Sequence, residues 1–136
     1  MNKKIIIMLL LSFAITIQAD VPKKYLLDMV NNINKSVPVM IDKDTRLDTT
    51  MSIGTNNVTY QYTMINLTKS HWTNISETKR VMQNQMEQIN CQDEKSIVRQ
   101  FGVTMVYKYR DMNYVPILET KVDKEICKKY YKGGIQ

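Results

Sequence analysis

The segment Val103–Val122 reads VTMVYKYRDMNYVPILETKV and carries the clearest structural signal in the chain. Its two halves alternate apolar or aromatic residues with polar ones, and the polar turn Asp111-Met112-Asn113 separates them. Such a pattern predicts a β-hairpin. Because Pro116 cannot donate a ladder hydrogen bond, we expect its strand at a sheet edge or beside a bulge.

The chain upstream of this hairpin alternates between helical and extended patterns. Apolar residues recur at helical spacing in some stretches and at every second position in others. The predicted helices cover residues 22–35, 74–90 and 93–101. The two additional predicted strands cover residues 49–53 and 58–67. The element order is αββ-α(α)-ββ. We therefore expect an α+β fold in which helices pack on one face of a four-stranded antiparallel sheet made of two hairpins.

Residues 1–19 have the three-part layout of a secretory signal peptide. Lys3 and Lys4 form a positive start, an apolar run covers 5–17, and Ala19 offers a small residue for cleavage. The apolar run is too short to cross a bilayer, which needs about 20 helical residues. An uncleaved membrane anchor is the alternative, and after cleavage we expect no transmembrane segment.

The rest of the chain divides into a single α+β domain over 20–128 and a flexible basic tail over 129–136. The formal charge of +6 falls to +4 when Lys3 and Lys4 leave with the signal peptide. Lysines at the C-terminal end carry most of what remains, so the body of the domain is near neutral and offers no nucleic-acid-binding face. These features predict a periplasmic or secreted bacterial protein.

Cys91 and Cys127 are the only cysteines. An even number of cysteines in an exported chain favours a disulfide between them. The bond would close a loop of about 36 residues, and in the chain-entropy model it stabilises the fold by roughly 4 kcal/mol. Two buried free thiols, or a catalytic thiol with its partner, are the alternatives. The presence of a single histidine, His71, disfavours the thiol enzyme.

The densest polar cluster follows a short apolar run and contains Asp42, Asp44, Arg46 and Asp48. Several carboxylates on one loop can bind a hard cation such as Ca²⁺, but the central glycine and distal glutamate of an EF-hand loop are missing. A polar turn that leads into a strand is the favoured structural interpretation. As a binding site, this loop is our first candidate, because recognition residues concentrate on loops beside a rigid sheet.

His71 and Trp72 form the second candidate binding site. An exposed aromatic ring beside an imidazole can contact a partner, and the imidazole can act in acid–base chemistry. A Trp72 that is buried over the sheet edge is the favoured alternative. No serine, cysteine or carboxylate stands at a recognisable spacing from His71, so a catalytic triad is not supported. We predict no catalytic residue, no metal and no cofactor.

Two pairs of tyrosines share strand faces, Tyr60 with Tyr62 and Tyr107 with Tyr109. They can form a contact platform for a peptide or glycan, since tyrosine combines a large ring with a polar tip. Burial beneath the helices is the favoured alternative, because apolar residues such as Val58 lie on the same faces.

Several motifs follow one another along the mature chain. They are PVMIDKDTRLD at 38–48, YQYT at 60–63, Cys91, GV at 102–103 with YKY at 107–109, and Cys127. In that order they resemble a group of small exported bacterial proteins with no assigned activity. The resemblance implies an envelope location and paired cysteines, and it implies nothing about chemistry.

A disulfide-stapled α+β domain without a catalytic constellation favours a small exported protein of the bacterial envelope that works by binding. Such a protein is an inhibitor, an immunity-like protein or an assembly accessory, and its partner is another envelope protein. The alternatives are a structural envelope component and, third, a hydrolase that uses His71 with an aspartate.

Overall fold

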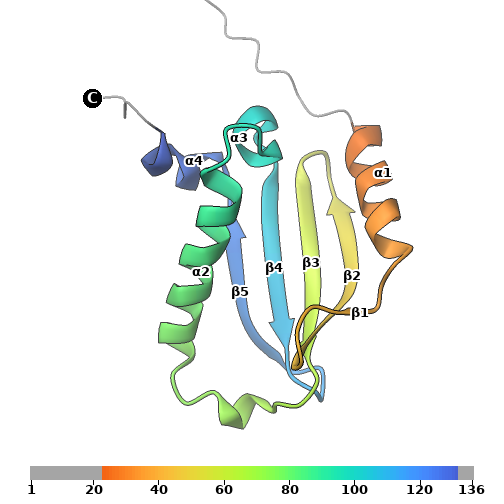
Figure 1. Cartoon of the computed structure of the whole chain (residues 1–136), viewed down its shortest axis with the longest axis vertical. Coiled ribbons are helices and arrows are strands. Elements are labelled where there is room, and N and C mark those ends of the chain that lie inside the picture. Colours follow the sequence, from red (N-terminus) through yellow and green to blue (C-terminus); the bar gives the residue numbers. More distant parts are fainter. Residues whose placement is uncertain (1–22, 132–136) are drawn as a thin grey trace, which may run out of the picture.

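The computed structural model describes residues 23–131 (Figure 1). The predicted signal peptide at 1–19 lies outside the described residues. The helices are α1 (Lys23–Asn34), α2 (Ile75–Cys91), α3 (Ile97–Phe101) and α4 (Lys124–Cys127), with the 3-10 turns η1 (Lys69–His71) and η2 (Lys128–Tyr130). The strands are β1 (Val39–Met40), β2 (Thr45–Ile53), β3 (Asn57–Met64), β4 (Thr104–Arg110) and β5 (Pro116–Val122). None of the described helices is long and apolar enough to cross a membrane.

The strands form one mixed sheet in the order β1-β2-β3-β4-β5. Neighbouring strands are antiparallel except β3 and β4, which are parallel. The α+β class and both predicted hairpins, β2–β3 and β4–β5, are confirmed, but the expected sheet of four antiparallel strands is wrong. Helix α2 supplies the reason. It carries the chain back along the sheet, so that β4 starts at the same end as β3 (Figure 1).

The additional strand comes from the short apolar run that precedes the polar cluster. Val39 and Met40 pair with β2 at the edge of the sheet. β2 itself begins at Thr45 and not at the predicted Thr49, so the stretch 42–48 is turn in its first half and strand in its second. The start of β2 was not predicted because its residues are polar. They are polar because one face of this strand is not covered by helices.

Capping residues set the ends of the helices. The Asn74 side chain accepts a hydrogen bond from the backbone N–H of Glu77 and begins α2, as the sequence pattern predicts. α3 is shorter than the predicted segment 93–101, because Ser96 caps it and accepts a backbone N–H one turn further on. Gly102 ends α3 with a φ of 68°, a left-handed conformation that glycine adopts without a steric penalty.

The hydrophobic core lies between one face of the sheet and the helices. On this face, which we call the helix face, Val58, Met105 and Val122 from three strands are buried with Leu26 of α1 and Val98 of α3. Helix α1 packs on β2 and helix α2 packs on β5, so the two flanks of the helix face are covered (Figure 1). No described helix packs on the opposite face, which we call the open face.

Cys91 at the end of α2 forms a disulfide with Cys127 of α4, and both residues are fully buried. The segment after Cys127 packs against α2 as far as the described residues extend, and residues 132–136 of the predicted tail lie outside them. Glu87 of α2 anchors this segment: Lys129 Nζ lies 2.5 Å from its carboxylate, and the Tyr130 hydroxyl donates to it at 3.0 Å. The packed domain therefore extends through Tyr131.

Candidate functional site

The candidate residues from the sequence gather at one end of the sheet, the lower end in Figure 1, where β2 and β5 start and β3 and β4 finish. Three loops meet there, formed by residues 42–44, 65–73 and 111–115. Backbone hydrogen bonds join the middle loop to the first at Ile65 and to the third at Met112. The side chains nevertheless point to different faces and have different partners.

Asp42 and Asp44 build the turn that starts β2. The Asp42 carboxylate accepts hydrogen bonds from the backbone N–H groups of Asp44 and Thr45, both at 2.8 Å. The bond from Asp44 is the main cause that lowers the pKa of Asp42. Asp44 accepts a bond from the Asn66 side chain at 3.0 Å. Within residues 23–131, no cluster of three acidic, histidine or cysteine side chains has the arrangement of a metal site.

Arg46 and Asp48 lie on the open face, in a cluster that the sequence pattern did not reveal. Asp48 Oδ1 accepts a hydrogen bond from Arg46 Nε at 2.6 Å, and Oδ2 accepts one from Arg110 Nη2 at 2.9 Å. The Thr63 hydroxyl donates to Asp48 and accepts from Arg110 Nε at 2.9 Å. We call Arg46, Asp48, Thr63 and Arg110 the arginine cluster. Its members come from β2, β3 and β4, which only the folded sheet brings together.

The arginine cluster keeps Asp48 ionised. Burial on its own raises the pKa of this carboxyl group, but the hydrogen bonds from Thr63, Arg46 and Arg110 outweigh burial and lower the pKa. Hydrogen bonding to Asp48 in turn raises the pKa of Arg46. Two guanidinium groups share one carboxylate, so the cluster has a net positive charge.

A cavity of about 520 Å³ opens on the open face beside the arginine cluster. Its lining residues are Gln61, Lys108, Tyr109, Arg110, Tyr114, Pro116, Ile117, Leu118 and Glu119. Arg110 belongs both to the cluster and to the cavity wall, and its guanidinium lies 4.5 Å from the centroid of the Tyr114 ring. Lys108 and Glu119, on neighbouring strands, form an ion pair at 3.7 Å.

Asp111 holds the loop that presents Tyr114. Its Oδ1 accepts hydrogen bonds from the backbone N–H groups of Asn113 and Val115, both at 2.8 Å. Its Oδ2 accepts one from the backbone N–H of Lys69 at 2.9 Å. These bonds stabilise Tyr114 at a φ of 64°, which costs a non-glycine residue about 1–2 kcal/mol. Sequence reasoning identified Asp111 only as part of a polar turn, since its bonding partners depend on the fold.

His71 is exposed and closes the turn η1, where its Nδ1 accepts a hydrogen bond from the backbone N–H of Thr68 at 3.1 Å. No carboxylate is hydrogen-bonded to His71 within residues 23–131, so the orienting acid of a catalytic triad is missing from the described part of the chain. Trp72 is half-buried and packs against the hydrophobic core.

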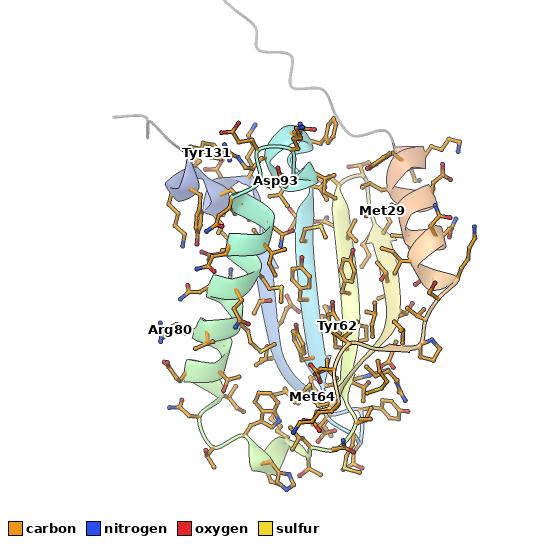
Figure 2. All side chains as sticks on the ribbon, viewed as in Figure 1. Met29, Tyr62, Met64, Arg80, Asp93 and Tyr131 are labelled. Carbon is orange, nitrogen blue, oxygen red and sulfur yellow. A yellow bond between two sulfur atoms is a disulfide. The ribbon has the colours of Figure 1, made fainter. Side chains whose placement is uncertain are left out.

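Four tyrosines form a row of stacked rings in the centre of the helix face. The parallel register places Tyr60 beside Tyr107 and Tyr62 beside Tyr109, and the ring centroids of these pairs lie 5.4 and 4.9 Å apart. Tyr107 and Tyr109 are buried, whereas Tyr60 and Tyr62 are only half-buried. We call these four residues the tyrosine ladder. Figure 2 shows Tyr62 on β3, between α1 and α2.

Burial raises the pKa of every tyrosine in the ladder above the ordinary value of 10, at which a phenol is already uncharged at neutral pH. It raises the pKa of Tyr107 to about 12, although the hydrogen bond that Asn90 donates to the Tyr107 hydroxyl at 2.9 Å acts in the opposite direction. Burial also raises the pKa of Tyr109 to about 12, with a further contribution from the negative charge of Asp42. The ladder is therefore a neutral surface that combines apolar ring area with polar hydroxyl groups at neutral pH.

The sequence model of a family described as a domain of unknown function (DUF8479) matches residues 21–118. The chain therefore belongs to that family. No curated protein sequence matches the chain.

Two solved structures are similar in fold to this chain. A crystal structure of a Pseudomonas aeruginosa protein described as secreted aligns with a TM-score of 0.61 at 14% sequence identity, covering 77% of this chain and 91% of that one. The pilotin EpsS of the Vibrio vulnificus type 2 secretion system aligns with a TM-score of 0.57 at 13% identity, covering 77% of this chain and 90% of that one. At these identities the likeness establishes the fold. Neither protein is named as an enzyme.

Proposed function

We propose that this protein is an exported accessory of a bacterial envelope secretion machinery, and that it works by binding an apolar segment of another envelope protein. The observation that carries the proposal is the tyrosine ladder. Tyr60 and Tyr62 stay half-buried in the middle of the sheet face that the helices otherwise cover. Tyrosine is among the residues enriched at the centres of protein interfaces and among those that contribute most to binding.

The surroundings of the ladder favour a partner segment with apolar side chains. Methionines from both flanking helices, Met29 of α1 and Met82 and Met86 of α2, are partly buried against the same core. Figure 2 shows Met29 on the side of α1 that faces the centre of the sheet. Methionine adapts its shape to different neighbours, which suits a surface that must accept a segment from another protein.

Three observations support export and an accessory role. The first residues have the pattern of a signal peptide. The buried disulfide between Cys91 and Cys127 is typical of a domain that folds in an oxidising compartment. The fold is shared with a protein described as secreted and with a pilotin of a type 2 secretion system. Together they favour a binding partner among the components of a secretion machinery.

Site-specific photocrosslinking in the bacterium of origin tests the proposal. A photoreactive phenylalanine analogue replaces Tyr62 on the helix face, and in a matched control it replaces Met51, which is exposed on the open face. We expect the variant at Tyr62, and not the variant at Met51, to form one adduct with an envelope protein that mass spectrometry identifies as a secretion component.

A functional measurement complements the crosslink. Tyr62→Ser removes ring area from the ladder and uncovers one face of the Tyr109 ring, so urea unfolding is used to check separately that the variant folds. We expect this variant to lower the amount of secreted substrate in the culture medium. An identical adduct from both crosslinking positions, or a partner unrelated to secretion, would contradict the proposal.

A further inference from the structure

We propose that the cavity on the open face is a second binding site, and that it recognises a carboxylate group on a small ligand or at the end of a short peptide. Most of the lining residues lie on the side of the sheet opposite the tyrosine ladder, although Tyr109 belongs to both. The inference does not rest on the proposed function, because it is argued from Arg110 and its partners. Its volume of about 520 Å³ falls in the usual range for small-ligand sites, about 300–1,000 Å³.

The hydrogen-bonding capacity of Arg110 points to an anion. A guanidinium group has about five N–H donors in a planar fork. Thr63 accepts from Nε and Asp48 accepts from Nη2, and the remaining donors of Arg110 have no protein partner among residues 23–131. The same side chain lines the cavity. A carboxylate is the group that an arginine fork binds with two parallel hydrogen bonds.

Charge balance favours a single negative charge on the ligand. The cluster and the cavity wall hold three cations, Arg46, Lys108 and Arg110, against two carboxylates, Asp48 and Glu119. One carboxylate on the ligand neutralises this excess. A phosphate dianion would exceed this excess by one negative charge, which is less favourable electrostatically.

The site is held in place before any ligand arrives. Thr63 and Asp48 hold one edge of the Arg110 guanidinium, and the Tyr114 ring supports its plane at 4.5 Å. Tyr114 in turn is held in its left-handed conformation by the loop that Asp111 organises. A prearranged arginine loses little conformational entropy on binding, which raises affinity for a small ligand.

Nuclear magnetic resonance titration of the folded, oxidised protein tests the site. The probe is the peptide acetyl-Gly-Ala-Gly with a free C-terminus, and its amidated form lacks the carboxylate. A second arm uses acetyl-Gly-Asp-Gly-amide, which presents a side-chain carboxylate instead. We expect saturable shifts of the backbone amides between Lys108 and Glu119 with the free-acid peptide and none with acetyl-Gly-Ala-Gly-amide. The aspartyl arm shows whether a terminal or a side-chain carboxylate is preferred.

Variants then assign the interaction. Arg110→Lys keeps the charge but removes the fork, and we expect it to weaken binding about tenfold. If Arg110→Lys unfolds, Lys108→Gln gives a second measurement, because the Lys108 side chain is exposed and does not hold the arginine cluster together. We expect Lys108→Gln to lower the affinity for the free-acid peptide by a smaller factor. Lys24→Gln on α1 is the remote control and should bind normally. Equal shifts with acetyl-Gly-Ala-Gly-amide, no saturation in the millimolar range, or displacement by an equal concentration of inorganic phosphate would overturn the proposal.

Discussion

Asp48 illustrates how a side chain that looks like a loop ligand in the sequence becomes a structural centre in the fold. The sequence groups it with Asp42 and Asp44, but it lies in strand β2, where it is the extra residue of a β-bulge between Leu47 and Thr49. Its carboxylate then meets cations from two different strands, Arg46 and Arg110. Neighbours in sequence thus have different roles: Asp42 builds a turn, and Asp48 organises the open face.

We expect Asp48→Asn to lower the free energy of unfolding by about 1.5–3 kcal/mol at neutral pH, because it weakens charge-assisted hydrogen bonds in a mostly buried cluster. The folded-state pKa of Asp48 lies below its ordinary value of 3.8, so its stabilisation is fully present above that value and is lost as the pH falls through the lowered pKa. Urea unfolding at a series of pH values measures this, and the gap between wild type and variant should narrow in acid.

Asp28→Asn is the matched control for this measurement. Asp28 pairs with Lys24 on the exposed side of α1, where a salt bridge contributes about 0–1 kcal/mol. A gap between Asp48→Asn and wild type that does not change with pH would show that Asp48 does not act through its charge.

At the scale of the secondary-structure elements, α2 decides both the topology and the protection of the sheet. Its length returns the chain to the far end of the sheet, which makes β3 and β4 parallel and brings the two tyrosine pairs into register. It also covers the outer edge of β5. Gln83 donates to the backbone carbonyl of Lys121 at 2.7 Å and accepts from its N–H at 3.1 Å, so a side-chain amide takes the place of a neighbouring strand.

We expect Gln83→Ala to expose this part of the β5 edge. The backbone N–H of Lys121 loses its acceptor, so its hydrogen exchange should accelerate, and the domain should lose about 1 kcal/mol of stability. Hydrogen exchange followed by nuclear magnetic resonance measures both effects. Gln88→Ala, at an exposed position of the same helix, should leave Lys121 unchanged. Equal exchange rates in the two variants would rule out edge protection by Gln83.

At the scale of the whole molecule, the disulfide and the contacts of Glu87 join the C-terminal segment to α2, the helix that runs along β5. Cys91 and Cys127 close a loop of 36 residues that contains α3, β4 and β5. Burial raises the pKa of Glu87, but hydrogen bonds from Lys129, Gln83 and Tyr130 outweigh it, so that the pKa is lowered. The second half of the sheet is thus tied to α2 at two neighbouring points.

Replacing both cysteines, as Cys91→Ser with Cys127→Ser, should lower the free energy of unfolding by about 2–4 kcal/mol, because the unfolded chain regains the entropy of an open loop. Urea unfolding of the oxidised wild type and the double variant gives this difference directly. A reductant should destabilise the wild type and have no effect on the double variant. Equal stability of the two proteins would show that the disulfide does not constrain the unfolded chain.

Local patterns in the sequence were sufficient to predict most elements. Alternation predicted the β4–β5 hairpin, helical spacing predicted α1 and α2, and Gly102 marked the end of α3. The pairing of two cysteines in one chain followed from their number. These features depend on residues that are close in sequence or on simple counting, so no knowledge of the tertiary contacts was needed.

Only the tertiary structure decided which strands lie side by side. The parallel β3–β4 contact stacks Tyr62 on Tyr109 and places Arg110 beside Asp48, and both candidate sites depend on it. Period-two alternation specifies the two faces of a strand but not its neighbour, because the neighbour is chosen by the path of the connecting helix and by the packing of the whole core. The sequence by itself therefore determined most of the elements and favoured the disulfide, and the fold determined the sites.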